Sequence, residues 1–247
     1  MKNDIKELNK IFENIKKTGW IKSRRKGTTG IGYTFESLIG KEEDSFPLPD
    51  FKSLEIKTIR KNSRRNVHLF SINPDGDVDN PIQKILNVLG YKKFGGQEIR
   101  CWIDVYVNKI IQLGYYKRVF IKVNRNRKKI ELIALNMNNE KYNLNVSWSF
   151  DKIQERLNNK IKYLAVIIAD SKIINNEEFF YYENINYYKV KNFDQFISLI
   201  ENGKIIVSIK VQKRNGKYGG HGMDFTIPER IIEELYEKLD IKKKKNN

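Results

Sequence analysis

The sequence predicts a mixed α/β fold, with a mixed central sheet flanked by helices. Amphipathic helical segments alternate with β-branched and aromatic runs, without a strict strand–helix–strand rhythm. The continuous apolar run at 163–169 is typical of a buried central strand. The 13 Tyr and 13 Phe residues argue against disorder, because disordered chains contain few aromatic residues.

The first ninety residues contain the signals for three helices and two strands. Helix starts are indicated by capping residues such as Asn3 and Asn80, and helix ends by Gly19, Gly40 and Gly90. The predicted elements are a helix following Asn3, a helix at 33–40, a strand at 51–59, its hairpin partner at 67–72 and a helix at 81–89.

The remaining residues predict further strands with helices between them. Their order is strands within 103–123, at 129–135 and ending at Trp148, a helix from Phe150, the buried strand at 163–169, an aromatic strand at 179–188, a helix at 192–201, a strand at 204–211, a glycine-rich loop at 213–222 and a helix from Pro228.

The charge balance indicates a polyanionic partner. Lys and Arg number 47 against 30 Asp and Glu, a formal net charge of +17, and such a field attracts nucleic acid. A membrane surface and a Lys-rich composition from an AT-rich genome are the alternatives. No apolar run is long enough to span a membrane, and the charged N-terminus has no signal-peptide core, so we expect a cytoplasmic protein with no membrane partner. The single cysteine, Cys101, excludes an internal disulfide and a cysteine-based zinc site.

The segment PDFKSLEIKT at 49–58 carries the candidate chemistry. Residues two apart in a strand share a face, so Glu55 and Lys57 point together while Ile56 points toward a core. Asp50 precedes the strand and can bend back beside Glu55. Two converging carboxylates favour a hard cation such as Mg²⁺, with the Ile56 carbonyl as a further ligand. Such a metal activates water and neutralises a scissile phosphate, and Lys57 supplies a fixed positive charge.

A solvated ion pair on a strand edge is the alternative explanation of this pattern. Three neighbouring features favour the chemical interpretation. Leu54 and Ile56 give the strand a buried face, Glu36 on the upstream helix can supply a third carboxylate, and basic tracts at 22–26 and 60–65 flank the segment.

Several motifs in the same order resemble the restriction endonucleases of the MvaI/BcnI type, relatives of the mismatch-repair nickase MutH. They are RKGTTGIGYTFE (25–36), PDFKSLEIKT, SWSFDKIQERLNNKIKYLAVIIADSK (147–172), ENGKI (201–205) and HGMDF (221–225). The resemblance spans nearly the whole chain. It implies a MutH-like PD-(D/E)xK nuclease core, with Asp50, Glu55 and Lys57 in catalytic positions and Glu36 as the upstream acid.

The resemblance also implies a type II enzyme that cuts double-stranded DNA. Family members act as monomers on short near-palindromic sites with CC and GG flanking a central base pair, and cut each strand in a separate event. A cognate methyltransferase is expected in the same system without direct binding. We expect one nuclease chain, 1–247, with a catalytic lobe centred on 1–165, a recognition lobe contributed mainly by 170–230 and a DNA cleft.

Candidate DNA-binding residues lie in basic segments on either side of the acidic centre. Arg and Lys pair with guanine in the major groove, and His donates to the same acceptors. By resemblance, the loop near His221 is the sequence-reading element, although 213–220 departs from the family pattern. The alternative for the loop residues is contact with phosphates alone, and the alternative for His68 is a structural role. The candidates are Arg25, Lys26, Arg64, Arg65, His68, Lys210, Lys213, Arg214, Lys217, Tyr218 and His221.

Two other functions are compatible with these features. A MutH-like repair nickase would share the chemistry but leave nicked circles. A non-catalytic basic DNA-binding protein would bind with a steep salt dependence and give no Mg²⁺-dependent product.

Overall fold

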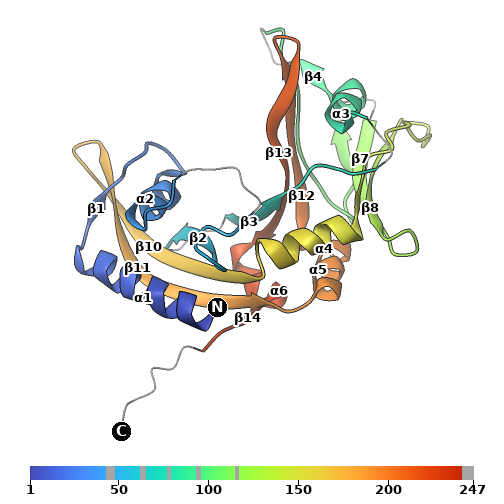
Figure 1. Ribbon diagram of the computed structural model, residues 1–247. Helices are drawn as coiled ribbons and strands as arrows, with labels where there is room; N and C mark the ends of the chain where they lie inside the picture. The colour runs from blue at the N-terminus through green and yellow to red at the C-terminus, as the bar shows by residue number, and fades with distance from the viewer. Residues whose placement is uncertain (43–47, 62–64, 77–78, 93–95, 115–116, 241–247) are drawn as a thin grey trace. The chain divides into compact units, whose positions relative to one another are not determined.

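The computed structural model describes residues 1–42, 48–61, 65–76, 79–92, 96–114 and 117–240, apart from the side chain of His221 (Figure 1). The chain forms two compact units, each assembled from separated segments. Unit 1 comprises Met1–Arg65, Leu157–Lys191 and Glu229–Asn247, and unit 2 comprises Asn66–Arg156 and Asn192–Pro228.

Unit 1 is built on a mixed sheet. Its strand order is β1 (Ile21–Lys22), β11 (Glu177–Val190), β10 (Tyr163–Ile174) and β2 (Glu55–Arg60), and β14 (Tyr236–Lys238) also pairs with β11. The β10–β2 pair is parallel and the other pairs are antiparallel. The apolar run at 163–169 therefore lies in an interior strand, as predicted, because β10 is hydrogen-bonded on both sides.

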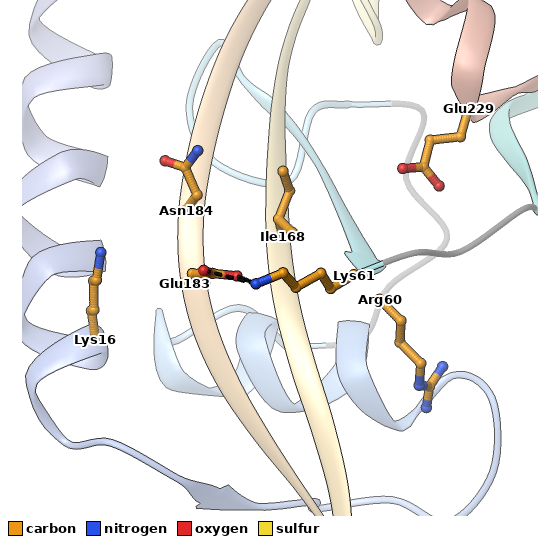
Figure 2. Close-up of a pocket in the computed structure, with 7 residues that line it drawn as sticks. All are labelled: Lys16, Arg60, Lys61, Ile168, Glu183, Asn184 and Glu229. Atoms are coloured by element: carbon orange, nitrogen blue, oxygen red, sulfur yellow. Dashed lines mark hydrogen bonds and ion pairs between the residues drawn. The ribbon is translucent and has the colours of Figure 1, made fainter.

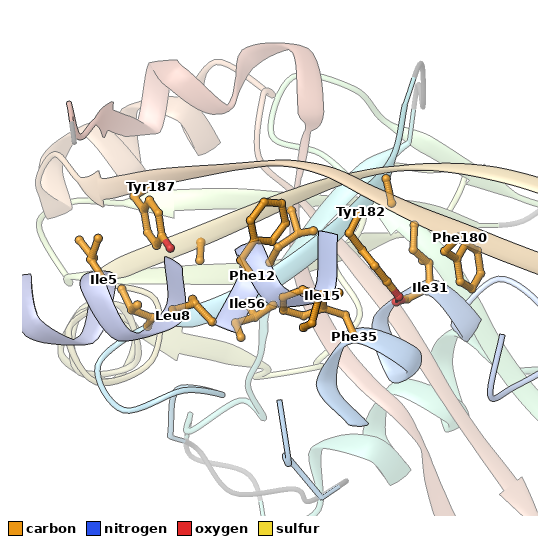
Figure 3. Close-up of a cluster of buried hydrophobic side chains, with 14 residues drawn as sticks. Ile5, Leu8, Phe12, Ile15, Ile31, Phe35, Ile56, Phe180, Tyr182 and Tyr187 are labelled. Atoms are coloured by element: carbon orange, nitrogen blue, oxygen red, sulfur yellow. The ribbon is translucent and has the colours of Figure 1, made fainter. Parts of the chain in front are cut away.

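Two helices cover the apolar face of this sheet. Helix α1 (Lys2–Lys17) buries Ile5, Leu8, Phe12 and Ile15 at helical spacing, and α2 (Gly30–Leu38) adds Ile31 and Phe35. Figure 3 shows these side chains in one cluster with Ile56 and the β11 aromatics Phe180, Tyr182 and Tyr187. The packing of Ile56 in this core thus holds β2 in place.

Unit 2 contains two antiparallel sheets. The first has the order β3 (Asn66–Ser71), β13 (Lys217–Pro228), β12 (Ile206–Arg214), β5 (Ile99–Val105) and β4 (Tyr91–Lys92). The second has the order β6 (Ile111–Leu113), β7 (Lys117–Asn124), β8 (Lys129–Leu135) and β9 (Ser147–Ser149). Helices α3 (Pro81–Leu89) and α5 (Phe193–Glu201) lie in this unit, and α4 (Phe150–Asn159) begins in it and ends in unit 1.

The mixed α/β class is confirmed, but two strand predictions are wrong. Residues 51–54 form a tight turn with Lys52 at φ 53°, so the strand begins only at Glu55. The predicted hairpin between this strand and 67–72 does not form, because β2 pairs with β10 and β3 pairs with β13. Phe70 of β3 stacks on Phe225 of β13 at 5.2 Å between ring centroids, which shows where the apolar face of β3 finds its partner.

Two predictions in the last third of the chain are also wrong. The glycine-rich loop at 213–222 is largely strand, since β12 and β13 pair up to Arg214 and Lys217 around the two-residue turn Asn215–Gly216. Both turn residues have positive φ, 50° and 76°, as a tight hairpin turn requires. The helix predicted from Pro228 is only the short 3-10 turn Glu229–Ile231 and α6 (Ile232–Leu235), after which the chain returns to β14.

No helix among the residues described has the length and apolar character needed to cross a membrane.

Candidate active site

Strand β2 brings Glu55 and Lys57 together as the alternation predicts. The Lys57 Nζ atom donates to Glu55 Oε1 at 2.5 Å, and Ile56 between them is buried in the core. The Glu55 side chain is 1% exposed and the Lys57 side chain 21%, so the ammonium is the more accessible member of the pair. A carboxylate this deeply buried is a costly feature, which distinguishes the pair from a solvated ion pair on a strand edge.

Asp50 reaches this centre through the tight turn before β2. Phe51 and Leu54 exchange backbone hydrogen bonds of 2.9 and 2.8 Å, which close the turn. The turn folds the preceding chain back, and the Asp50 Oδ2 atom accepts a hydrogen bond from the Ile56 N–H at 3.0 Å. Asp50 is therefore fixed to the backbone of the strand that carries Glu55 and Lys57.

The protonation equilibria show how closely these charges interact. Burial raises the pKa of Glu55 and the Asp50 charge raises it further, whereas Lys57 and Lys160 act in the opposite direction. Burial acts to lower the pKa of Lys57, but the charges of Glu55, Asp50 and Glu36 outweigh it and the pKa is raised. All four predicted catalytic residues thus belong to one electrostatic cluster.

Lys160 is a member of this cluster that the sequence analysis missed. It follows the last residue of α4, and its Nζ atom lies 3.7 Å from Glu55 Oε2. The same ammonium donates to the Leu48 carbonyl at 3.4 Å. No local pattern signals this contact, because Lys160 and Glu55 meet only through the pairing of β10 with β2.

Glu36 lies on α2, which approaches β2 at Gly32. A Cβ atom at Gly32 would lie 3.1 Å from Thr58 Oγ1 and 3.6 Å from Glu36 Oε1, so glycine permits the close approach. A hollow of about 290 Å³ beside this contact is lined by residues that include Glu36 and Thr58. Arg25 also lines it, with its guanidinium 3.8 Å from the centroid of the Tyr33 ring.

The carboxylates present fit a divalent cation. The Glu55 Oε2 atom is buried and has no hydrogen-bond partner, an arrangement that a metal ion would satisfy. The Asp50 carboxylate is close enough to raise the pKa of Glu55, and both are hard oxygen ligands. Among the described residues, no group of three or more His, Cys, Asp or Glu side chains is arranged as a preformed metal site. Asp50, Glu55 and the Ile56 carbonyl therefore stay the predicted ligands.

A second cluster of charged residues lies in unit 2, on the sheet formed by β3, β13 and β12. Asp224 is 8% exposed at its side chain and accepts from Ser71 Oγ at 2.7 Å and from Lys210 Nζ at 3.1 Å. The His68 Nε2 atom lies 3.4 Å from Asp224 Oδ1. Burial acts to raise the pKa of Asp224, but the bonds from His68, Ser71 and Lys210 outweigh it and lower the pKa to about 2. The acid thus anchors two exposed basic side chains on one face.

The same face carries residues of β5 that the sequence analysis also missed. Lys210 pairs with Trp102 across the ladder, and Ser208 pairs with Asp104, so these side chains share a face. Trp102 is 42% exposed and its ring lies 4.6 Å from the Arg100 guanidinium. The alternation in IRCWIDV, with Cys101 and Val105 buried, was a signal that could have placed Trp102 outward. We call this cluster, composed of His68, Ser71, Trp102, Asp104, Ser208, Lys210 and Asp224, the β12 face.

The other candidate DNA-binding residues are more scattered. The Lys213 ammonium lies 4.9 Å from the centroid of the Tyr218 ring near the hairpin turn, and Arg214 pairs with Lys217 beside it. Lys26 and Arg65 are exposed at unit 1 positions. Arg64 lies outside the described residues, and so does the side chain of His221, whose backbone is in β13.

A larger hollow of about 500 Å³ lies at the opposite end of β2 from Glu55 (Figure 2). Lys61 and Glu183 form an ion pair of 3.0 Å there, and Arg60 also lines the hollow. None of the predicted catalytic residues lines it. The larger volume therefore does not identify the candidate active site, which lies around the buried carboxylate of Glu55.

Known proteins resemble the chain over nearly its whole length. A model of the MvaI/BcnI restriction endonuclease family matches residues 8–236. The chain belongs to this family. Two solved structures resemble it: restriction endonuclease MvaI in complex with a cognate DNA substrate, at 31% identity and a TM-score of 0.86, and MvaI in the absence of DNA, at 29% identity and a TM-score of 0.60. Each comparison covers 97% of this chain and 98% of the other. A search of curated proteins gave no match.

Membership of the MvaI/BcnI family confirms the predicted resemblance and the fold class together. It also makes the chain a restriction endonuclease, so the prediction of a nuclease is confirmed at that level. The individual site residues stay predictions, supported by the geometry around Glu55.

Proposed function

We propose that the chain is a type II restriction endonuclease that hydrolyses double-stranded DNA with Mg²⁺ at a short near-palindromic site flanked by CC and GG. One observation carries the chemical part: Glu55 is buried between two ammonium groups, and one of its oxygens has no hydrogen-bond partner. A structural ion pair does not require a buried carboxylate oxygen to lack a hydrogen-bond partner. The family match and the likeness to an MvaI–DNA complex support the substrate.

Each residue in the centre has a separate role in this proposal. Asp50 and Glu55 hold Mg²⁺ together with the Ile56 carbonyl, and Glu36 contributes a further acid. Bound Mg²⁺ supplies charge neutralisation at the phosphate and makes water a better nucleophile. Lys57, the more accessible member of the pair, places its ammonium where negative charge develops on the phosphate oxygens and orients the attacking water.

The β12 face and the hairpin end supply the DNA contacts in this proposal. Lys210 and His68 offer donors for base edges, and Asp224 holds both in place before DNA binds. Arg25, Lys26, Arg64, Arg65, Lys213, Arg214, Lys217, Tyr218 and His221 provide further contacts to phosphates or bases. We propose that the protein acts as a monomer, cuts one strand at a time and shares its target with a cognate methyltransferase.

Digestion of a supercoiled plasmid of known sequence, followed by run-off sequencing of the ends, tests this function. The expected product with Mg²⁺ is a set of linear fragments with fixed ends at CC/GG-flanked sites, with nicked circles as a transient intermediate. The Lys57→Ala variant, purified in parallel, reveals any contaminating nuclease. Nicked circles that never become linear would favour the MutH-like nickase, and binding without any product would favour a non-catalytic protein.

A further inference from the structure

We infer that Lys160 is a positioning residue of the nuclease centre. It restrains the segment that carries Asp50 relative to Glu55, and its positive charge weakens the binding of a metal ion at Glu55. This inference rests on the proposed function of Asp50, Glu55 and Lys57. Lys160 lies far from these residues in the sequence and joins them only in the folded chain.

The contacts of Lys160 connect the two segments that carry the acids. Its ammonium donates to the Leu48 carbonyl, two residues before Asp50, and lies 3.7 Å from Glu55 Oε2. The Asp50 segment is otherwise attached to β2 through its turn and the Ile56 N–H. Lys160 thus adds a bond from a third segment, and its side chain is largely buried, with 19% exposed.

The distance to Glu55 distinguishes Lys160 from Lys57. Lys57 makes a hydrogen bond to Oε1 at 2.5 Å, whereas 3.7 Å is an ion-pair distance beyond the length of a hydrogen bond. Oε2 therefore has a nearby positive charge but keeps its lone pairs. Lys160 reduces the cost of burying the carboxylate without occupying the oxygen that a metal ion would bind.

This arrangement has opposite consequences for metal binding and for turnover. Without the Lys160 charge, the acids attract a divalent cation more strongly, because one competing positive charge is gone. Without the bond to Leu48, the Asp50 segment loses a restraint, and the reacting groups are less well aligned. A residue that merely supports the fold would weaken metal binding and turnover together.

The test compares Lys160→Met with Lys160→Arg and with the control Lys162→Met, which removes an exposed lysine two residues away. Binding of Mn²⁺ to the full chain without DNA is measured by electron paramagnetic resonance. In parallel, single-turnover cleavage is measured across a Mg²⁺ titration. Thermal unfolding of each variant is recorded, to confirm that it is folded under the assay conditions.

We expect Lys160→Met to bind Mn²⁺ about five-fold more tightly, which is the size of effect for loss of a neighbouring charge in a partly buried site. We expect its cleavage rate at saturating Mg²⁺ to fall about ten-fold or more. Lys160→Arg should retain most of the wild-type values, and Lys162→Met should match wild type. Weaker Mn²⁺ binding by Lys160→Met, or unchanged binding and cleavage, would overturn the inference. If Lys160→Met does not fold, Lys160→Gln takes its place under the same criteria. A wild-type chain that binds Mn²⁺ but never cuts DNA would instead contradict the proposed function.

Discussion

The carboxylate of Asp50 accepts a 3.0 Å hydrogen bond from the backbone N–H of Ile56, the residue between Glu55 and Lys57. This bond separates two roles of Asp50, because an asparagine side chain can still accept it. We predict that Asp50→Asn keeps the thermal stability of wild type but lowers single-turnover cleavage by on the order of 100-fold or more, since the negative charge is lost.

The matched control for Asp50→Asn is Asp4→Asn. The Asp4 carboxylate, on α1, accepts a hydrogen bond of 2.5 Å from Ser53 Oγ in the turn before β2. Asp4→Asn should cut DNA at the wild-type rate. Wild-type cleavage by Asp50→Asn would remove Asp50 from the chemical centre.

The Glu55–Lys57 pair predicts a specific pattern of stability. Lys57→Met leaves the buried Glu55 carboxylate with Lys160 as its remaining cation, and we expect a loss of about 2 kcal/mol in the free energy of unfolding. The double variant Glu55→Gln/Lys57→Met also removes the buried carboxylate charge and should recover most of that loss. Urea unfolding of the two single variants and the double variant measures the coupling free energy.

Lys61→Met serves as the control for the pair, because its ion pair with Glu183 is half exposed. We expect no resolvable change in the free energy of unfolding, because solvent screens an exposed ion pair. A loss in the double variant equal to the sum of the losses in Glu55→Gln and Lys57→Met would show that the two side chains are not energetically coupled.

Much of this centre was predictable from the sequence because it is local. The period-two alternation of a strand places Glu55 and Lys57 together, and the buried Leu54 and Ile56 confirm the inward face. Lys160 was not predictable, since it reaches Glu55 only through the parallel β10–β2 pairing, and the sequence contains no local record of that partner. For the same reason the sequence does not predict that β3 pairs with β13 rather than with β2.

The hairpin at 213–222 was misassigned for a different reason. Its many glycines suggest a loop, yet Asn215–Gly216 is the standard signal of a two-residue hairpin turn, and the flanking residues continue the ladder. Trp102 was overlooked because an aromatic residue in a strand usually packs inward, whereas here Cys101 and Val105 form the buried face.

The low pKa of Asp224 predicts a pH dependence of stability. Its pKa is about 2 in the folded chain and near 3.8 in the unfolded chain. The folded state therefore favours the charged form, and this stabilisation is fully present above about pH 5 and disappears as the pH falls through 4 to 2. We expect the free energy of unfolding of wild type to exceed that of Asp224→Asn by on the order of 2 kcal/mol at neutral pH. This difference should shrink as the pH falls from 4 to 2.

Urea unfolding at a series of pH values measures this difference. Asp151→Asn, which alters an exposed acid on α4, is measured in parallel as the control for loss of a surface carboxylate. A wild-type advantage over Asp224→Asn that stays constant down to pH 2 would contradict the assignment of the low pKa to the bonds from His68, Ser71 and Lys210.

The β12 face predicts a distinction between two kinds of lysine. Lys210→Gln should weaken binding to the target sequence by about ten-fold while changing binding to unrelated DNA much less, because a base contact carries specificity. Lys122→Gln, an exposed lysine on β7, should weaken both only slightly and by the same factor. Fluorescence anisotropy without Mg²⁺, at a fixed salt concentration, measures both affinities. Equal losses on the two DNAs for Lys210→Gln would reassign it to phosphate contact.

The parallel pairing of β2 with β10 also determines when this enzyme can first act during its own synthesis. Lys57 lies opposite Val166 and Arg60 opposite Ala169, so the strand carrying Glu55 and Lys57 has its complete ladder partner only after the ribosome has made the chain through Ala169. Glu55 likewise has no Lys160 beside it before that point. A shorter nascent chain contains PDFKSLEIKT but not the framework that holds it. We therefore expect an unfinished or prematurely released product not to cut DNA.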